Sequence, residues 1–198
     1  MGSKMIDKLR TNYRKVASLW KKFRFLILKD GFARADFLRK HNYLAGIGED
    51  VIYYSRIFPA DAKLLKIGSH VDIATNVRFL GHDGINRILS AMYSQNYTRT
   101  HGCIEVGNYV FIGSDSIILP NIRIGDNTII GAGSIVTKDL EPGFIWGGVP
   151  AKRIGVFQDL IDRRKDDLHP EKRPEELWKS FYAQREPMDI QQQKDVEQ

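Results

Sequence analysis

The sequence predicts a mainly β protein, a parallel β-helix carried by hexapeptide repeats, and three observations support this fold class. First, an aliphatic residue returns at every sixth position: Val106, Ile112, Ile118, Ile124, Ile130 and Val136. A period of six fits neither an α-helix nor an isolated strand, but it is typical of a β-helix that lays one short strand per repeat on each face of a prism. Second, glycine follows four of these six residues, which suits a corner where a Cβ would clash or a positive φ is needed. Third, small, β-branched or aliphatic residues recur four positions after each, and they fit the remaining interior space.

A basic helical segment is expected over residues 4–45. Apolar residues recur there at spacings of three and four across 9–27, a pattern that predicts amphipathic helix. The pattern breaks near Gly31, and a second short helix is expected over 33–41. The segment holds twelve Lys and Arg against three Asp, a net charge of +9 in a chain of net charge +6.

Two interpretations of this charge stay open. It is either the solvated face of a helix that caps the β-helix, or a source of attraction to an anionic membrane surface, a lipid-linked phosphate or an acidic glycan. Nucleic acid is not expected as a partner, because no aromatic residues alternate with the basic ones.

The β-helix domain is expected over residues 46–155, with one loop inserted at 81–103. The period of six begins imperfectly and is broken at 59–62. Val106 follows Phe79 by 27 positions, which is not a multiple of six. A loop must therefore leave the coil between them, and loops on a regular scaffold tend to carry function.

The C-terminal part is expected to be a helical segment over 156–185. Apolar stripes predict one helix over 157–167, and a leading proline with early glutamates predicts another over 174–182. Residues 186–198 are polar and rich in glutamine, so a disordered tail is expected.

A single cysteine, Cys103, permits no internal disulfide and favours a reducing compartment. No apolar run approaches the ~20 residues that span a bilayer. We therefore expect a cytoplasmic protein, with the inner face of the membrane as the alternative location. Cys103 lacks an evident orienting pair, so it is interpreted as a packed thiol and not as an acylated nucleophile. Residues 106–141 contain no histidine, so no metal site is expected.

The end of the array resembles the hexapeptide-repeat acyltransferases. The resemblance is carried by residues 130–139, IGAGSIVTKD, and residues 147–152, GGVPAK. It is closest to the branch of maltose, galactoside and xenobiotic acetyltransferases, serine acetyltransferases and polysaccharide O-acetyltransferases. The basic N-terminal helices and the pattern at 79–83 look most like capsule or surface-polysaccharide O-acetyltransferases. The resemblance implies a left-handed β-helix, a homotrimer with active sites between subunits, and acetyl-CoA as acyl donor.

Residues 81–84, Gly-His-Asp-Gly, resemble the catalytic-histidine loop of that family. The resemblance makes His82 the general base that activates an acceptor hydroxyl, a task that suits an imidazole because its pKa lies near operating pH. The alternative is an ordinary turn histidine, since His-Asp-Gly is also turn chemistry. His101, at the other end of the loop, is the second candidate for the base and is otherwise a surface or acceptor-contacting residue.

Further site residues follow from the resemblance. The expected contacts of acetyl-CoA, through backbone groups and basic or aromatic side chains, are Ser114, Ala132, Thr137, Lys138, Trp146, Lys152 and Arg153. For Trp146 two interpretations stay open: it stacks near the adenine, or it only covers the end of the β-helix. The expected contacts of a saccharide acceptor are Tyr53, Arg56, Asp61, Asp83, Tyr93 and Tyr97.

The predicted function is acetyl-CoA-dependent O-acetylation of a sugar hydroxyl in a cell-surface or capsular polysaccharide or its precursor. One alternative is an acetyltransferase for a small molecule such as an antibiotic or serine. A second alternative is a non-catalytic β-helix scaffold, which would need neither His82 nor a loop that breaks the period.

Overall fold

A computed structural model describes residues 16–17, 19–165 and 173–184 of the chain. The chain divides into two units, Met1–Leu160 and Ile161–Gln198. The first unit contains the β-helix and everything that positions the candidate site.

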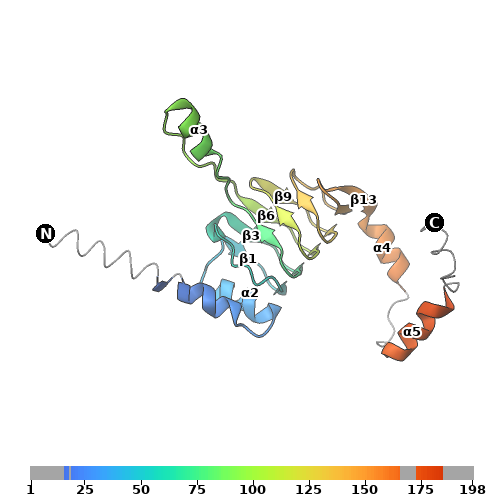
Figure 1. Ribbon diagram of the computed structural model, residues 1–198. Helices are drawn as coiled ribbons and strands as arrows, with labels where there is room; N and C mark the ends of the chain where they lie inside the picture. Colours follow the sequence, from blue (N-terminus) through green and yellow to red (C-terminus); the bar gives the residue numbers. More distant parts are fainter. Residues whose placement is uncertain (1–15, 18, 166–172, 185–198) are drawn as a thin grey trace, which may run out of the picture. The chain divides into compact units, whose positions relative to one another are not determined.

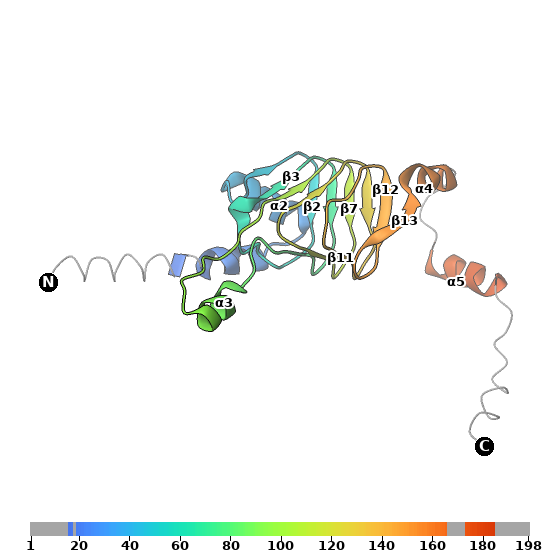
Figure 2. The same ribbon diagram turned by 90° about the horizontal axis from the view of Figure 1, so that it is seen from above.

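Three sheets form the walls of the β-helix (Figures 1 and 2). Sheet A contains β1 (Gly46–Ile47), β3 (Leu65–Ile67), β6 (Ile104–Val106) and β9 (Ile122–Ile124). Sheet B contains β2 (Val51–Tyr53), β4 (Val71–Ile73), β7 (Val110–Ile112), β10 (Thr128–Ile130), β12 (Phe144–Gly147) and β13 (Lys152–Val156). Sheet C contains β5 (Arg78–Phe79), β8 (Ile117–Ile118) and β11 (Ile135–Val136). From β3 to β11 the chain visits A, B and C in strict rotation, and all pairs are parallel except β12 with β13. The predicted parallel β-helix is confirmed.

The aliphatic residues of the six-residue period form the interior column. All six from Val106 to Val136 are at most 1 % exposed. Residues three repeats apart stand in register, as Ile112 opposite Ile130 and Ile118 opposite Val136 show. Burial of these side chains, worth about 1.5–3 kcal/mol each, stabilises one coil on the next.

Of the two reasons predicted for glycine at the corners, a Cβ clash or a positive φ, the structure supports the first. A Cβ at Gly113 would lie 2.4 Å from the backbone nitrogen of Ala132 in the next coil, so close approach does require glycine there. Positive φ, in contrast, falls on other corner residues, for example Asn76, Asp115 and Asn127, at φ values of 60°, 61° and 52°. Asn and Asp tolerate this conformation better than other non-glycine residues. At Gly107, Gly113 and Gly125 glycine therefore serves packing between coils and not backbone conformation, whereas a Cβ at Gly131 would make only an ordinary contact at 3.5 Å.

Helices cover the first coil. Residues 19–26 are helical, and α2 (Gly31–Lys40) packs on β2 and begins after Asp30, whose carboxylate accepts a hydrogen bond from the N–H of Ala33 at 2.9 Å. Buried Arg34 donates to the carbonyl oxygens of Tyr53 and Leu28 at 2.8 and 2.9 Å. The break predicted near Gly31 is thus present, and α2 begins two residues before the predicted start.

Both interruptions of the period have structure of their own. The break at 59–62 leads into a short 3-10 helix, η1 (Ala62–Leu64). The inserted loop contains α3 (Asn86–Tyr93), which projects from the coil (Figures 1 and 2) and buries none of its residues.

After the coil, β13 returns antiparallel to β12 and α4 (Phe157–Arg164) follows. The second unit contains α5 (Pro174–Ala183), with proline in its first turn and Glu176 hydrogen-bonded to Arg173. Both helices lie where the sequence predicts them, whereas the predicted tail at 186–198 and the first residues of the basic segment lie outside the described residues. Within the described ranges, no helix has the length and apolar character needed to cross a membrane.

Candidate active site

The candidate site is built where the two interruptions of the period meet. Asp61 stands at the end of the break before η1, and His82 stands at the start of the inserted loop. The Nδ1 atom of His82 is hydrogen-bonded to Oδ2 of Asp61, and the two side chains are 30 % and 21 % exposed. They are thus partly withdrawn from water, yet within reach of a ligand.

The loop is closed at its base by its own backbone. His82 and His101 form an antiparallel bridge, and the N–H of Gly102 donates to the carbonyl of Gly81 at 2.9 Å. A Cβ at Gly81 would lie 2.5 Å from the Cβ of Asp61, closer than real Cβ atoms approach one another. Glycine before the histidine is therefore what lets Asp61 reach the imidazole.

This hydrogen bond fixes the chemistry of the imidazole. A carboxylate accepts hydrogen bonds, so Nδ1 of His82 carries the proton and Nε2 presents a lone pair. The Nη1 atom of Arg99 lies 3.5 Å from that Nε2 atom. A neutral imidazole oriented by a carboxylate is suited to take a proton from a hydroxyl.

His101 completes a group of three potential metal ligands. Its ring centroid lies 5.5 Å from that of His82, and one donor atom each from Asp61, His82 and His101 lie within 4.8 Å of one another. The expectation of no metal site considered only residues 106–141, which exclude these three. Asp61 and His82 already hydrogen-bond to one another. We therefore interpret the group as a hydrogen-bonded pair with His101 beside it, and not as a set of metal ligands.

Two predicted site residues lie in the core. Tyr53 is 1 % exposed, its hydroxyl donates to the carbonyl of Ile57 at 3.2 Å, and burial raises its pKa. Trp146 is 6 % exposed and lies beside Ile130 in sheet B. Burial leaves little of either side chain accessible to a ligand, and the contacts of Tyr53 with an acceptor and of Trp146 with acetyl-CoA stay predictions.

Asp61 belongs to the pair with His82, a role that the sequence interpretation missed when it assigned this residue to the acceptor. The sequence feature that indicates this role is the position of Asp61 in the break at 59–62, which interrupts the six-residue period ahead of the inserted loop. Asp83 holds the loop, since its carboxylate accepts the N–H of Ile85 at 3.1 Å. Arg56 is exposed and donates to the carbonyl of Leu26 at 3.0 Å. In the inserted loop, the ring centroids of Tyr93 and Tyr97 lie 6.2 Å apart.

The residues expected to contact acetyl-CoA occupy other parts of the prism. Ser114 and Ala132 lie at the corner between sheets B and C, where the N–H of Gly133 donates to the carbonyl of Ser114 at 2.8 Å. The side chains of the remaining four, Thr137, Lys138, Lys152 and Arg153, are exposed near the last coil. The Asp61–His82 pair, in contrast, lies where the chain returns to sheet A.

Cys103 also differs from expectation. It is exposed at the end of the loop and is not a packed thiol.

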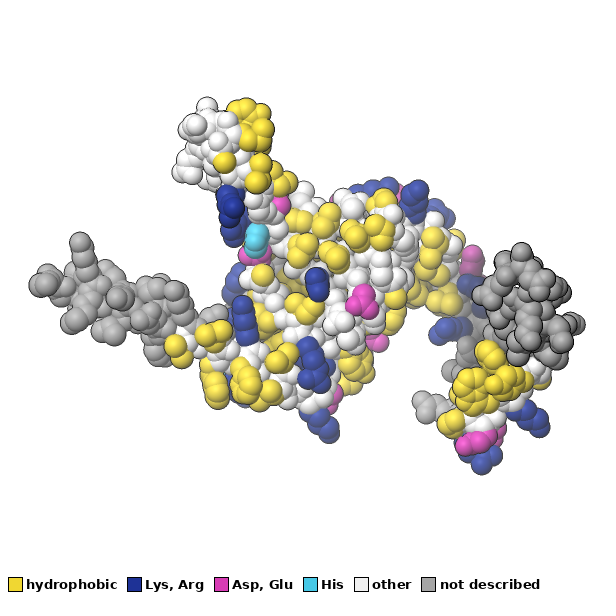
Figure 3. Space-filling view, viewed as in Figure 1, with side chains coloured by type: hydrophobic (Ala, Val, Ile, Leu, Met, Phe, Trp, Pro, Cys, Tyr) yellow, Lys and Arg dark blue, Asp and Glu magenta, His cyan; other side chains and the backbone are white. Residues whose placement is uncertain are grey.

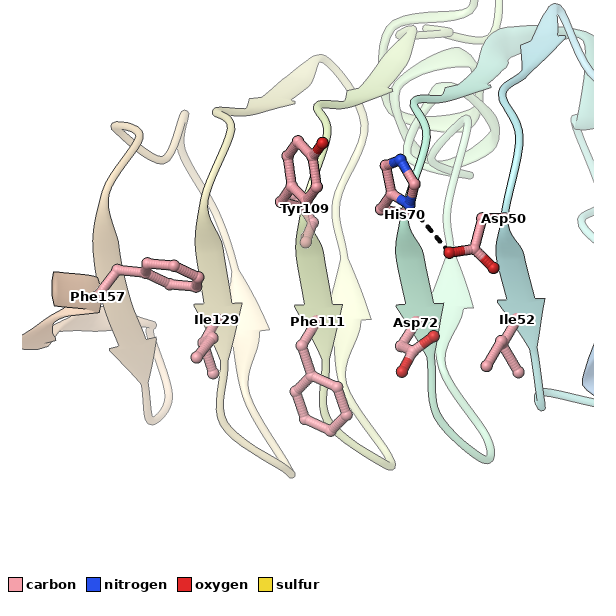
Figure 4. Close-up of a pocket in the computed structure, with 9 residues that line it drawn as sticks. Asp50, Ile52, His70, Asp72, Tyr109, Phe111, Ile129 and Phe157 are labelled. Atoms are coloured by element: carbon pink, nitrogen blue, oxygen red, sulfur yellow. Dashed lines mark hydrogen bonds and ion pairs between the residues drawn. The ribbon is translucent and has the colours of Figure 1, made fainter. Parts of the chain in front are cut away.

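A groove on the outer face of sheet B was not predicted at all. Figure 4 shows Ile52, Asp72, Phe111 and Ile129 projecting from four neighbouring strands. At its edge His70 is hydrogen-bonded to Asp50 at 2.9 Å and stacks on the ring of Tyr109. Burial, together with a neighbouring carboxylate, raises the pKa of Asp72. None of the predicted site residues lines this groove.

Comparison with known proteins agrees with this architecture. The family model described as bacterial transferase hexapeptide (six repeats) matches residues 104–138. Galactoside O-acetyltransferase of Escherichia coli strain K12 is 40 % identical over 109 residues, which cover 53 % of this chain and 49 % of that protein. Protein CapG of Staphylococcus aureus is 43 % identical over 113 residues, which cover 54 % of this chain and 63 % of that protein.

Among solved structures, a galactoside acetyltransferase in complex with coenzyme A superposes with a TM-score of 0.59 at 25 % identity. The superposition covers 82 % of this chain and 87 % of that one. The chain matches about half to two thirds of the length of the two curated relatives described above.

Proposed function

We propose that this chain, which belongs to the hexapeptide-repeat acyltransferases, is an acetyl-CoA-dependent O-acetyltransferase. Its acceptor is a sugar hydroxyl of a cell-surface or capsular polysaccharide or its precursor. The observation that carries this proposal is the Asp61–His82 pair at the base of the inserted loop. The similarity of this chain to galactoside O-acetyltransferase supports a saccharide acceptor.

The pair performs the proton transfers of the reaction. An alcohol is a poor nucleophile until a positioned base takes its proton. His82 accepts the hydroxyl proton at Nε2, the hydroxyl oxygen bonds to the acetyl carbonyl carbon, and the carbon–sulfur bond breaks. His82 then returns the proton to the departing sulfur. Asp61 holds Nδ1–H throughout and stabilises the positive charge while the ring carries both protons. Bound acetyl-CoA supplies the acetyl group, and no acyl-enzyme is needed.

The donor site belongs between subunits of a homotrimer of left-handed β-helices. Ser114 and Ala132 lie at one corner of the prism and the Asp61–His82 pair near another, so the two halves of the site are proposed to meet across an interface. The outer faces of the sheets support this proposal. Sheet B presents Phe111, which is 43 % exposed, beside Ile129, whereas sheet A is covered by ion pairs. An exposed apolar face marks a contact surface.

The N-terminal helix is proposed to contact the inner face of the membrane. Trp20, Phe23 and Ile27 are 62 %, 51 % and 60 % exposed on a segment that also carries the excess of basic residues. Exposed aromatic and aliphatic residues together with cations are typical of helices that lie in an anionic lipid interface. Co-sedimentation with vesicles of anionic lipid, lost in a Trp20→Ser and Phe23→Ser variant, tests it; equal binding to purely zwitterionic vesicles would argue against it.

The function is tested by mass spectrometry of a saccharide panel incubated with acetyl-CoA and the chain. We expect a hexose-containing acceptor to gain one acetyl group with the unaltered protein, and the rate to fall about 10²- to 10⁴-fold with His82→Ala. Equal activity of the variant would transfer the role of base to His101.

The same panel separates the alternatives. If acetyl-CoA binds but no saccharide is modified, antibiotics, serine and other small molecules become the acceptors to test. If acetyl-CoA does not bind at all, the chain is a β-helix scaffold.

A further inference from the structure

A second cavity lies directly beside the proposed base. Its volume is about 390 Å³, and the residues of the first break, 59–64, form one wall. Asp61 lines this cavity while its carboxylate holds His82. The cavity and the candidate base therefore share a residue.

Three lysines converge on this cavity. Lys21 and Lys22 come from the N-terminal helix and Lys63 comes from η1. The Nζ atom of Lys21 lies 3.5 Å from the centroid of the Tyr43 ring and 4.8 Å from that of Phe58. The cavity thus gathers three cations, one of which lies over two aromatic rings.

Within the described residues, no ion pair neutralises the charges of these lysines. The Nζ atom of Lys63 donates to the carbonyl of Asn42 at 2.6 Å, a neutral acceptor. The pKa of Lys21 is lowered by burial first and then by the charges of Lys63 and Lys22. Like charges held together at a cost in solvation indicate a site for an anion.

The one carboxylate in the cavity does not offset this charge. Asp61 already shares its charge with His82, and three cations remain around it. A sugar diphosphate diester carries about two negative charges and several strong acceptor oxygens, and lysine binds phosphate as a point charge. A neutral saccharide would leave the three ammonium groups without a counter-charge.

We propose that this cavity, lined by Lys21, Lys22 and Lys63, binds the diphosphate of an activated sugar, so that the acceptor is a diphosphate-linked saccharide and not a free neutral one. The inference rests on the proposed function, because it names the acceptor class of that site. With its diphosphate among the lysines, the sugar extends past Asp61 toward His82. The diphosphate belongs either to a nucleotide or to a polyprenyl carrier, and these two sources share the chemistry that the cavity recognises.

The first experiment measures binding of inorganic pyrophosphate to the full chain by isothermal titration calorimetry. The variants are Lys22→Gln and Lys63→Gln, because Lys21 touches core rings and its loss would disturb folding. Lys29→Gln is the matched control, since Lys29 is an exposed lysine of the same segment that does not line the cavity. We expect each cavity variant to weaken binding about tenfold, the control to leave it unchanged, and added salt to weaken it further. No binding, or equal binding by all variants, would overturn the proposal.

The second experiment compares acetyl transfer to three acceptors with the same hexose: a methyl hexoside, a nucleoside-diphosphate hexose and a polyprenyl-diphosphate hexose. We expect a diphosphate-linked acceptor to have the lowest KM, and Lys22→Gln to raise that KM about tenfold with little change in kcat. The preferred one of the two diphosphate acceptors identifies the carrier.

The outcomes separate this inference from the proposed function. Equal KM values for all three acceptors, unchanged in Lys22→Gln, would leave the O-acetyltransferase standing and reject the diphosphate site. Pyrophosphate binding without transfer to any saccharide would reject the acetyltransferase and keep the site.

Discussion

The regular coil from β6 to β11 and the two interruptions at 59–64 and 81–103 differ in what their residues do. In the coil, the inward positions are aliphatic residues together with Ser116, Thr128 and Ser134, all of them buried, and the outward positions vary. In the interruptions, the side chains that form the candidate site and the neighbouring cavity are a carboxylate, imidazoles and a lysine, and they are partly exposed. The regular part therefore supplies stability and position, while the proposed catalytic pair lies in the two interruptions of the period.

The candidate site needs both interruptions of the period, because each supplies one residue of the Asp61–His82 pair. His82 alone, at the start of a loop, would be a turn histidine. In the proposed mechanism it is an oriented base, because the earlier break brings Asp61, 21 positions away in sequence, to its Nδ1 atom. The coil makes this possible, since each turn stacks distant segments at a fixed corner.

Asp61→Asn should have the largest effect. An amide either donates to Nδ1, which reverses the tautomer of His82, or accepts without the charge that stabilises the imidazolium. We expect kcat to fall about 10²- to 10⁴-fold with the KM for acetyl-CoA unchanged. Steady-state kinetics measure this, and nitrogen NMR of the His82 ring reports the tautomer.

Asp83→Asn is the matched control, because Asp83 lies next to His82 but serves as an acceptor for the N–H of Ile85, which asparagine also provides. If Asp83→Asn were as inactive as Asp61→Asn, Asp61 would not be the positioning residue.

The next prediction compares how much the coil and the inserted loop contribute to the free energy of unfolding. Ile112 is fully buried in the column, and Ile112→Ala should lower the free energy of unfolding by about 2–5 kcal/mol. Ile88 in α3 is 58 % exposed, and Ile88→Ala should change it by less than about 0.5 kcal/mol. Denaturant unfolding compares the two, and similar losses would mean that α3 packs on a surface of the folded protein.

A glycine substitution tests the junction of the two interruptions. A Cβ at Gly81 would meet the Cβ of Asp61 at 2.5 Å, so Gly81→Ala must displace Asp61 or the loop. We expect a loss of about 1–3 kcal/mol in the free energy of unfolding together with reduced acetyl transfer. At Gly84 a Cβ would meet nothing within 4 Å, so Gly84→Ala should leave both unchanged. A fully active Gly81→Ala protein would show that the contact with Asp61 is dispensable.

The period of six was enough to predict the coil, because identical positions must stack and one aliphatic column satisfies them all. It also located the loop at 81–103, since Phe79 and Val106 are out of phase. It did not predict the partner of His82, because the approach of Asp61 depends on which corner each break occupies.

The burial of Tyr53 and Trp146 was not foreseen from the sequence, and it has one physical cause. Both are large aromatic residues in sheet B, where alternate side chains point inward. In the array the inward positions are aliphatic, and nothing in the spacing indicates that the coil also accepts aromatic rings near its ends. Burial depends on how the ends are covered, which the repeat does not encode.

The smallest effect is expected on the outer face of sheet A. Glu105 accepts hydrogen bonds from Lys66 and Arg123 at 3.0 and 2.9 Å, and these bonds lower its pKa below the ordinary value of 4.5. A depressed pKa stabilises the folded state above the unfolded-state value, and this stability is lost as the pH falls through the folded-state value. Glu105→Gln should therefore lower Tm slightly at pH 7 and match the unaltered protein at pH 3. The Glu105 side chain is 38 % exposed, so solvent screens both ion pairs and the difference should stay below about 1 kcal/mol. Thermal unfolding at the two pH values measures it, and a difference that persisted at pH 3 would mean that Glu105 acts through packing and not through charge.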